Sequence, residues 1–220
     1  MRISAIMCAY NEESTIKEVV LSLSETRIFD EIIVVNDGST DKTKQVIAEC
    51  KKSFNFLDIH LPKNMGKGFA MATGIENSTG DIIVFLDADL SNLTEEHLAQ
   101  LITPVLNNEA DMVLGQPTNT AIQSNINPFK FFAGQRALLK FDILPILDKM
   151  KESRFGVETL INIYYKSKSK KIILVDLVGL IHPIKYQKTT FLKATKQFLF
   201  EAKEIISTLI INYQILKHLF

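Results

Sequence analysis

The sequence predicts an α/β protein with a mostly parallel central sheet flanked by helices, and three observations lead to this prediction. Short apolar runs alternate with helix-length amphipathic segments over residues 1–116. The apolar runs are nearly continuous, as in parallel strands that are covered on both faces. Polar clusters follow the first, second and fourth runs, at the strand ends where such sheets bind ligands.

The first half of the chain contains five predicted strands and four predicted helices. The strands are the apolar runs at 3–8, 32–35, 56–59, 82–86 and 112–114. The helices are expected at 14–24, 41–52, 67–78 and 94–107, where the apolar residues have helical spacing. Asn92 or Thr94 is suited to cap the last of them.

The pattern is less regular after residue 116. Residues 116–128 are rich in Asn, Thr, Ser and Pro and predict a mobile loop. Helices are expected at 129–139 and 155–165, a strand at 172–178 and a long helix at 187–220. We interpret the chain as one domain with a ligand-binding half (1–116), a second half (117–186) and a C-terminal amphipathic helix (187–220).

Composition narrows the class of protein. The chain is 46% hydrophobic and 23% charged, which is typical of a globular protein and excludes a disordered one. Cys8 and Cys50 form no C-x-x-C pair and predict reduced thiols in a cytosolic protein. We expect neither a signal peptide nor a membrane span, because Arg2 leads directly into a core-like strand and no apolar stretch is long enough.

Charge is unevenly distributed along the chain. Residues 1–120 carry 9 basic and 18 acidic residues, a net charge of −9, whereas residues 121–220 carry 16 basic and 7 acidic residues, a net charge of +9. The acidic half could hold a metal while the basic half meets phosphate or an anionic surface. Alternatively, two solvated faces attract each other.

Asp87-Ala88-Asp89 follows the buried run at 82–86 and is the most informative motif. Side chains at i and i+2 of an extended chain point the same way, so both carboxylates can face one spot. Two like charges so close repel each other, and a divalent cation removes the repulsion. Oxygen ligands suit Mg²⁺ or Mn²⁺. The alternative is a polar turn in which an Asp caps the next helix.

Three further clusters lie at predicted strand ends or helix starts: 9–12 (Ala-Tyr-Asn-Glu), 36–41 (Asn-Asp-Gly-Ser-Thr-Asp) and 64–68 (Asn-Met-Gly-Lys-Gly). The last offers backbone N–H groups and the charge of Lys67 to an anion. It is not a Walker P-loop, and no G-x-G-x-x-G motif occurs. Each cluster alone is equally compatible with an ordinary turn or helix cap.

Taken together, the clusters resemble glycosyltransferase family 2, whose GT-A fold enzymes use nucleotide-diphospho-sugars. The resemblance covers residues 3–116 in order, including Val-Asn-Asp-Gly-Ser-Thr-Asp at 35–41 and Phe-Leu-Asp-Ala-Asp at 85–89. Gly-Gln-Arg-Ala at 134–137 and Arg-Phe-Gly-Val-Glu at 154–158 are similar to acceptor-side segments of the polyprenyl-phosphate sugar synthase and glucosyl-phosphoglycerate synthase branch. Ser91 departs from polyprenyl-phosphate mannosyl enzymes, which often carry Gln there.

The resemblance implies roles for individual residues. Asp37 would recognise a uracil or guanine base, and Lys67 would lie near the base or the diphosphate. Asp87 and Asp89 would hold the ribose and a Mg²⁺ or Mn²⁺ ion, with His182 as a third metal ligand or, alternatively, a plain loop histidine. The residues expected to bind the nucleotide are Ala9, Tyr10, Asn11, Glu12, Asp37, Gly66, Lys67, Asp87 and Ala88.

The implied reaction moves a sugar from a UDP- or GDP-sugar to an acceptor oxygen. A phosphate oxygen needs no strong base, whereas a hydroxyl needs a carboxylate to take its proton. Glu158 is the candidate base, with Asp148 in reserve, and Arg136 could clamp an acceptor phosphate with help from Arg154. Glu158 and Arg136 could equally be surface residues. With Asp89, they are the predicted catalytic residues.

The expected acceptor is a polyprenyl phosphate or a phosphorylated small molecule, and no nucleic-acid partner is expected. The basic amphipathic helix at 187–220 either lies on a membrane surface or packs on the sheet or in a homodimer. The expected location is the cytoplasm or the inner face of the membrane. Two alternatives are a non-catalytic nucleotide-sugar-binding protein and a sugar-nucleotide pyrophosphorylase. The second would need a Gly-rich basic loop where Ala-Tyr-Asn-Glu stands.

Overall fold

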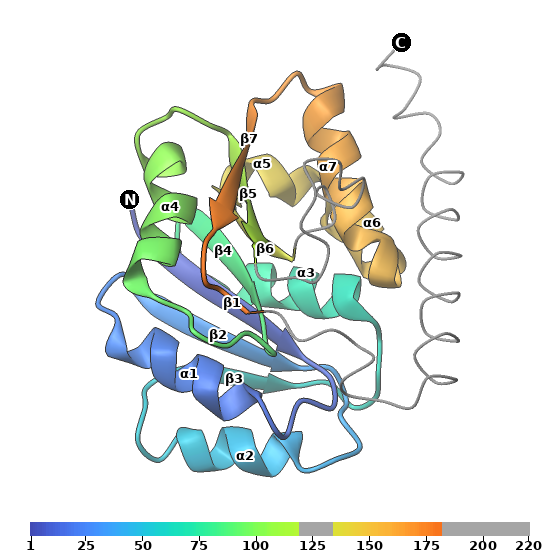
Figure 1. Cartoon of the computed structure of the whole chain (residues 1–220). Helices are drawn as coiled ribbons and strands as arrows, with labels where there is room; N and C mark the ends of the chain where they lie inside the picture. Colours follow the sequence, from blue (N-terminus) through green and yellow to red (C-terminus); the bar gives the residue numbers. More distant parts are fainter. Residues whose placement is uncertain (119–133, 182–220) are drawn as a thin grey trace.

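A seven-stranded sheet forms the centre of the protein (Figure 1). The structure is a computed structural model that describes residues 1–118 and 134–181. The strand order is β3-β2-β1-β4-β6-β5-β7, and β6 alone runs antiparallel to its neighbours within the described residues. The strands are β1 (Ile3–Ala9), β2 (Glu31–Asn36), β3 (Leu57–His60), β4 (Ile82–Asp87), β5 (Met112–Pro117), β6 (Gln135–Leu139) and β7 (Ile172–Leu177).

Helices cover both faces of the sheet, because alternate strand residues are apolar on both sides. Ala5 and Met7 of β1 pack in a core with α1, α2 and α4, whereas Ile6 packs in a second core with α3, α6 and α7. The helices are α1 (Ile16–Glu25), α2 (Thr43–Cys50), α3 (Lys67–Asn77), α4 (Glu95–Leu106), α5 (Lys140–Ile143), α6 (Leu147–Glu152) and α7 (Val157–Ser167), with short 3-10 turns η2 (Leu144–Ile146) and η3 (Arg154–Gly156).

The predicted α/β class and the alternation of the first half are confirmed. The five strands and four helices expected there are present, with ends shifted by at most three residues. Thr94 caps α4, since its hydroxyl accepts the N–H of His97. Among the described residues, no helix has the length and apolarity needed to cross a bilayer.

The helix predicted at 129–139 is wrong over its second part. Residues 135–139 form strand β6, which lies between β4 and β5 and pairs with both. Ala and Leu favour helices locally, but two neighbouring strands with unpaired backbone groups override that preference. Gln116 and Pro117, assigned to a loop, are the last residues of β5. Residues 119–133, the predicted helix at 187–220 and His182 lie outside the described residues.

Candidate functional site

The loops after β1 and β2 brace each other at the carboxyl end of the sheet. Asn11 has a φ of 57°, a left-handed conformation that Asn tolerates better than most residues. Its side-chain oxygen accepts the N–H of Thr40 at 2.8 Å, and its own N–H donates to the Ser39 hydroxyl at 3.0 Å. The N–H of Glu12 donates to the Thr43 hydroxyl at 2.8 Å. Two predicted clusters therefore form one rigid unit.

Asp37 lies inside this edge of the sheet rather than on its surface. It is only 3% exposed, and its carboxylate accepts the backbone N–H groups of Met65 at 2.7 Å and Gly66 at 2.9 Å. Burial raises the pKa of Asp37, although these two N–H groups and the charge of Arg154 oppose the rise. The N–H donors that we expected to bind a foreign anion thus hold a carboxylate of the chain itself.

Arg154 belongs to the same loop cluster and not to the surroundings of Arg136. One of its terminal nitrogens donates to the Asn64 side-chain oxygen at 3.3 Å. Its backbone packs on Gly66, where an added Cβ would lie 3.0 Å from the Arg154 Cα. Arg154 therefore supports the segment that holds Asp37, and its predicted help to Arg136 in binding an acceptor phosphate stays a prediction.

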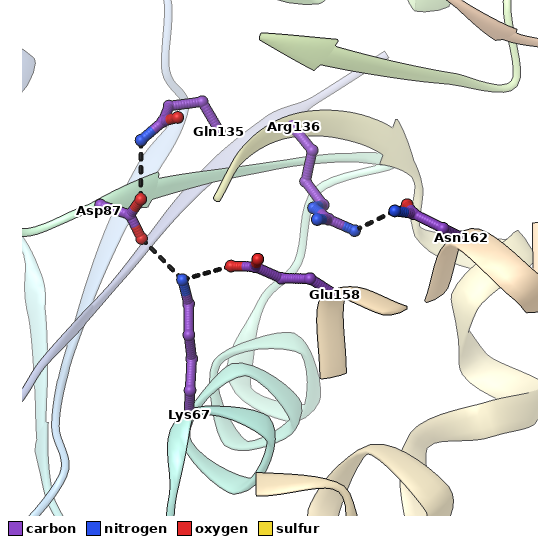
Figure 2. Close-up of polar contacts among 6 residues, drawn as sticks. All are labelled: Lys67, Asp87, Gln135, Arg136, Glu158 and Asn162. Atoms are coloured by element: carbon purple, nitrogen blue, oxygen red, sulfur yellow. Dashed lines mark hydrogen bonds and ion pairs between the residues drawn. The ribbon is translucent and has the colours of Figure 1, made fainter. Parts of the chain in front are cut away.

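Lys67 links two carboxylates from distant parts of the chain (Figure 2). Its ammonium lies 2.8 Å from Asp87 Oδ1 at the end of β4 and 2.6 Å from Glu158 Oε1 at the start of α7. Burial alone would lower the pKa of Lys67, but the charges of Asp87 and Glu158 outweigh burial and raise it above its usual range. Lys67 is therefore a permanent cation that lies between two carboxylates and reduces the repulsion between them.

The second oxygen of Asp87 is held by β6. The Gln135 amide donates to Asp87 Oδ2 at 2.8 Å (Figure 2). Gly134 leaves room for this carboxylate, because an added Cβ there would lie 2.1 Å from the same oxygen and would displace the Asp87 side chain. Sequence reasoning missed Gln135 as a site residue. Gln135 could have been found from the sequence, because it lies next to Arg136 in the Gly-Gln-Arg-Ala segment that resembles the acceptor-side segments of the family.

Arg136 is completely buried, so the alternative that it is an ordinary surface residue is wrong. Its guanidinium donates to the Asn162 side-chain oxygen at 3.4 Å and lies close to Glu158 (Figure 2). Burial lowers the pKa of Arg136, while the charges of Glu158 and Asp87 oppose that shift. Glu158 thus has cations on two sides. The reserve candidate Asp148 is exposed on α6 and takes no part in the described contacts of this cluster.

Cys8 lies on β1 directly beside Asp87 of β4. Burial raises the pKa of its thiol to about 12; the charge of Lys67 opposes this rise, and the charges of Asp37 and Asp87 add to it. The thiol is therefore protonated at neutral pH and unsuited to act as a nucleophile. Both cysteines are free, as predicted.

Ala88 and Asp89 form the turn after β4, where Ala88 is buried and Asp89 is partly exposed. Within residues 1–118 and 134–181, no three His, Cys, Asp or Glu side chains are grouped so that they could hold a metal ion by themselves. Mg²⁺ commonly takes only one or two protein carboxylates and completes its shell with water and substrate phosphates. The Asp87–Asp89 pair therefore fits a metal that arrives with a phosphorylated ligand.

The fold and this edge together define a doubly wound protein whose loops offer polar groups to a ligand beyond the strand ends. The family model described as glycosyl transferase family 2 matches residues 4–198, and the chain belongs to this family. The predicted GT-A fold is confirmed.

Curated relatives match parts of the chain. Poly-beta-1,6-N-acetyl-D-glucosamine synthase of Staphylococcus epidermidis is 36% identical over 88 residues, which are 40% of this chain and 21% of that protein. Dolichyl-phosphate beta-glucosyltransferase of Trichomonas vaginalis is 32% identical over 141 residues, 57% of this chain and 42% of that protein. The chain therefore spans less than half the length of these relatives.

Solved structures show the same fold. Glucosyl-3-phosphoglycerate synthase from Mycobacterium tuberculosis, in complex with phosphoglyceric acid, superposes with a TM-score of 0.74 at 22% identity, covering 95% of this chain and 79% of that one. The same enzyme with Mg²⁺ and uridine diphosphate gives a TM-score of 0.74 at 21% identity, with 95% and 78% covered.

Proposed function

We propose that the protein transfers a sugar from a UDP- or GDP-sugar to a phosphate-bearing or lipid-linked acceptor, with a divalent metal ion. The observation that carries this proposal is the joint arrangement at one sheet edge. The braced loops around Asn11 and Asp37 offer a nucleoside platform, and the Asp87–Lys67–Glu158 cluster lies at the end of the adjoining strand β4. The solved Mycobacterium enzyme was captured with Mg²⁺ or Mn²⁺ and uridine diphosphate, which supports the choice of ligand class.

Asp89, assisted by Asp87, would hold the metal. Bound there, Mg²⁺ or Mn²⁺ would supply positive charge for the diphosphate that leaves. Asp89 is the main protein ligand in this proposal, and the oxygens of Asp87 are also held by Lys67 and Gln135. The third ligand predicted at His182 remains a prediction.

The chain's own groups have separate tasks in the proposed reaction. Asp37 holds the loop against which the base lies, and Tyr10, 41% exposed, borders it. The bond from the anomeric carbon to the diphosphate oxygen breaks, and a bond to the acceptor oxygen forms. If the acceptor is a hydroxyl, its proton passes to a carboxylate, for which Glu158 is the candidate. Lys67 and Arg136 hold Glu158 in place.

The chemical class of acceptor is proposed from the relatives and the similar solved structures. The Trichomonas relative is named for a dolichyl phosphate, and the Mycobacterium structures contain phosphoglyceric acid, so we propose that an acceptor phosphate is the shared feature. A membrane-surface role for 187–220 is part of this proposal. Flotation of the full chain with anionic liposomes tests it, and absence of flotation would favour packing of that segment within a monomer or dimer.

The decisive assay follows release of nucleotide diphosphate from a panel of UDP- and GDP-sugars. Each is incubated with the full chain, Mn²⁺ and either 3-phosphoglycerate or a polyprenyl phosphate. We expect release that depends on acceptor and metal. Release of nucleoside triphosphate on addition of pyrophosphate would indicate a pyrophosphorylase instead, and tight binding without turnover would indicate a non-catalytic sensor.

The variant Asp89→Asn tests the proposed metal ligand. We expect turnover to fall at least about 100-fold, because several kcal/mol of charge stabilisation is lost. Asp176→Asn, which changes an exposed carboxylate on β7, is the matched control and should keep full activity. Equal turnover of wild type and Asp89→Asn, with both folded by circular dichroism, would contradict the assignment.

A further inference from the structure

A chain of hydrogen bonds runs from the outer edge of the sheet to the braced loops. It begins on β3, the edge strand, where the carboxylate of Asp58 pairs with Lys51 and lies 3.2 Å from His60 Nε2. The other ring nitrogen of His60, Nδ1, lies 3.2 Å from the side-chain amide nitrogen of Asn36. Asn36 and His60 are direct partners in the β2–β3 register.

The hydrogen bonds fix the orientation of each group. The backbone N–H of Ser39 can only donate, so the Asn36 atom 3.0 Å from it is the oxygen, and the amide nitrogen faces His60. That nitrogen also donates, so His60 Nδ1 accepts and its proton resides on Nε2, where it is donated to Asp58. His60 therefore joins two groups only as the neutral ring protonated at Nε2.

The far end of this chain reaches the proposed nucleotide platform. Asn36 is 2% exposed and directly precedes Asp37, and its side chain holds the turn at Ser39. The Ser39 hydroxyl in turn accepts the N–H of Asn11. His60 is the last residue of β3 and lies beside Asn36 at the same edge of the sheet, with a side chain that is 24% exposed.

We propose that His60 is a positioning residue for nucleotide binding, which it serves by holding Asn36 and thereby the Ser39 turn beside Asp37. The expected effect on nucleotide binding rests on the proposed function, whereas the link from His60 through Asn36 to the Ser39 turn does not. Without an acceptor at the Nδ1 position, the Asn36 amide has no partner there and the Ser39 turn loosens. In this proposal His60 acts through Asn36 and the Ser39 turn, so its effect is on donor affinity and not on the chemical step.

Two substitutions at position 60 separate the two ends of the ring. Asn places an oxygen where Nδ1 stands and can still accept from Asn36. Gln places its amide near the Nε2 position and can reach Asp58 but not Asn36. We expect His60→Gln and His60→Leu to weaken binding of UDP or GDP with Mn²⁺ about two- to tenfold, the equivalent of one hydrogen bond. His60→Asn should restore binding.

Calorimetric titration of the full chain and the donor dependence of turnover measure this effect. We expect a raised KM for the nucleotide sugar at unchanged kcat, as for an interaction made equally in ground and transition states. Equal affinity of wild type, His60→Leu and His60→Gln would overturn the proposal. So would a loss in His60→Asn as large as in His60→Gln, because stability of β3 alone would then explain the effect.

Amide hydrogen exchange tests the same link without any ligand. We expect the Ser39 amide to exchange faster in His60→Leu and His60→Gln than in wild type, and at the wild-type rate in His60→Asn. Unchanged exchange in all variants would refute the link. If exchange responds as expected but wild type binds no nucleotide, the proposed function fails while the positioning of Ser39 stands.

Discussion

At the scale of single residues, Lys67 is the centre of the candidate site. Asp87 and Glu158 are separated by more than seventy positions in the chain, and Lys67 touches both. Their side chains are 18% and 14% exposed, so water screens them only partly. Removal of the cation would leave two carboxylates facing each other. Breaking a buried ion pair destabilises the fold mainly because the remaining charge is buried without a partner of opposite sign.

We therefore expect Lys67→Met to lower the free energy of unfolding by about 1–3 kcal/mol. Adding Glu158→Gln removes one of the unpaired charges, and the double variant should lose less than the sum of the single ones by about 0.5–3 kcal/mol. Urea unfolding followed by circular dichroism measures both.

Lys151→Met is the matched control for this cycle. Lys151 also lies 2.6 Å from a carboxylate, that of Glu76, but this pair is more exposed and should contribute less than about 1 kcal/mol. If Lys67→Met and Lys151→Met destabilise the protein equally, the idea of a structurally important central cation is incorrect.

At the scale of elements, the start of α3 lies very close to the end of α6. Gly68, the second residue of α3, makes this approach possible. A Cβ there would lie 2.1 Å from the Met150 carbonyl oxygen and 2.7 Å from the Ser153 hydroxyl. The obstacle is mainly backbone, which cannot move away as a flexible side chain can.

Gly68→Ala should therefore destabilise the protein by about 1–3 kcal/mol, although Ala is the better helix former by about 1 kcal/mol. The expected loss comes from displacement of α6, and urea unfolding measures it. Asn77→Ala, at the exposed end of the same helix, is the control and should change stability little. If Gly68→Ala instead raises the free energy of unfolding, α6 can move away from the added methyl group without destabilising the protein.

The elements also show which features were predictable from the sequence. Strands such as Ile82–Asp87 were found because their apolar runs are long and are followed by polar turns. Strand Gln135–Leu139 was missed because its identity comes from its two neighbours and not from its own residues. Motif residues such as Asp87 and Lys67 were identified, but their contacts to Gln135 and Glu158 cross 48 and 91 positions, and no local pattern encodes them.

At the scale of the whole molecule, the two halves of the chain are interleaved. Ala137 of β6 pairs with Val84 of β4 on one side and with Val113 of β5 on the other. The opposite net charges of the halves also meet directly: Lys170 lies 2.9 Å from Asp111. Such contacts favour the interpretation that the acidic and basic parts attract each other within the fold.

We expect the two halves to unfold together, because β4 and β5 both lose a partner when β6 leaves. Native-state hydrogen exchange at low denaturant should give the same opening free energy for amides of β1 and of β6, equal to the global value. Destabilisation by Gly68→Ala should lower both values by the same amount. A lower opening free energy for β6 alone would show that the second half is a separate unit.

The antiparallel direction of β6 has one more consequence. The chain leaves β5 at Thr118 and re-enters the sheet through Gly134, and both points lie on the edge where Asp87 ends its strand. The register of β5 and β6 is set by the residue pairs from Met112↔Leu138 to Gly115↔Gln135. A foreign peptide spliced between Thr118 and Gly134 would therefore leave and re-enter the sheet beside the candidate site.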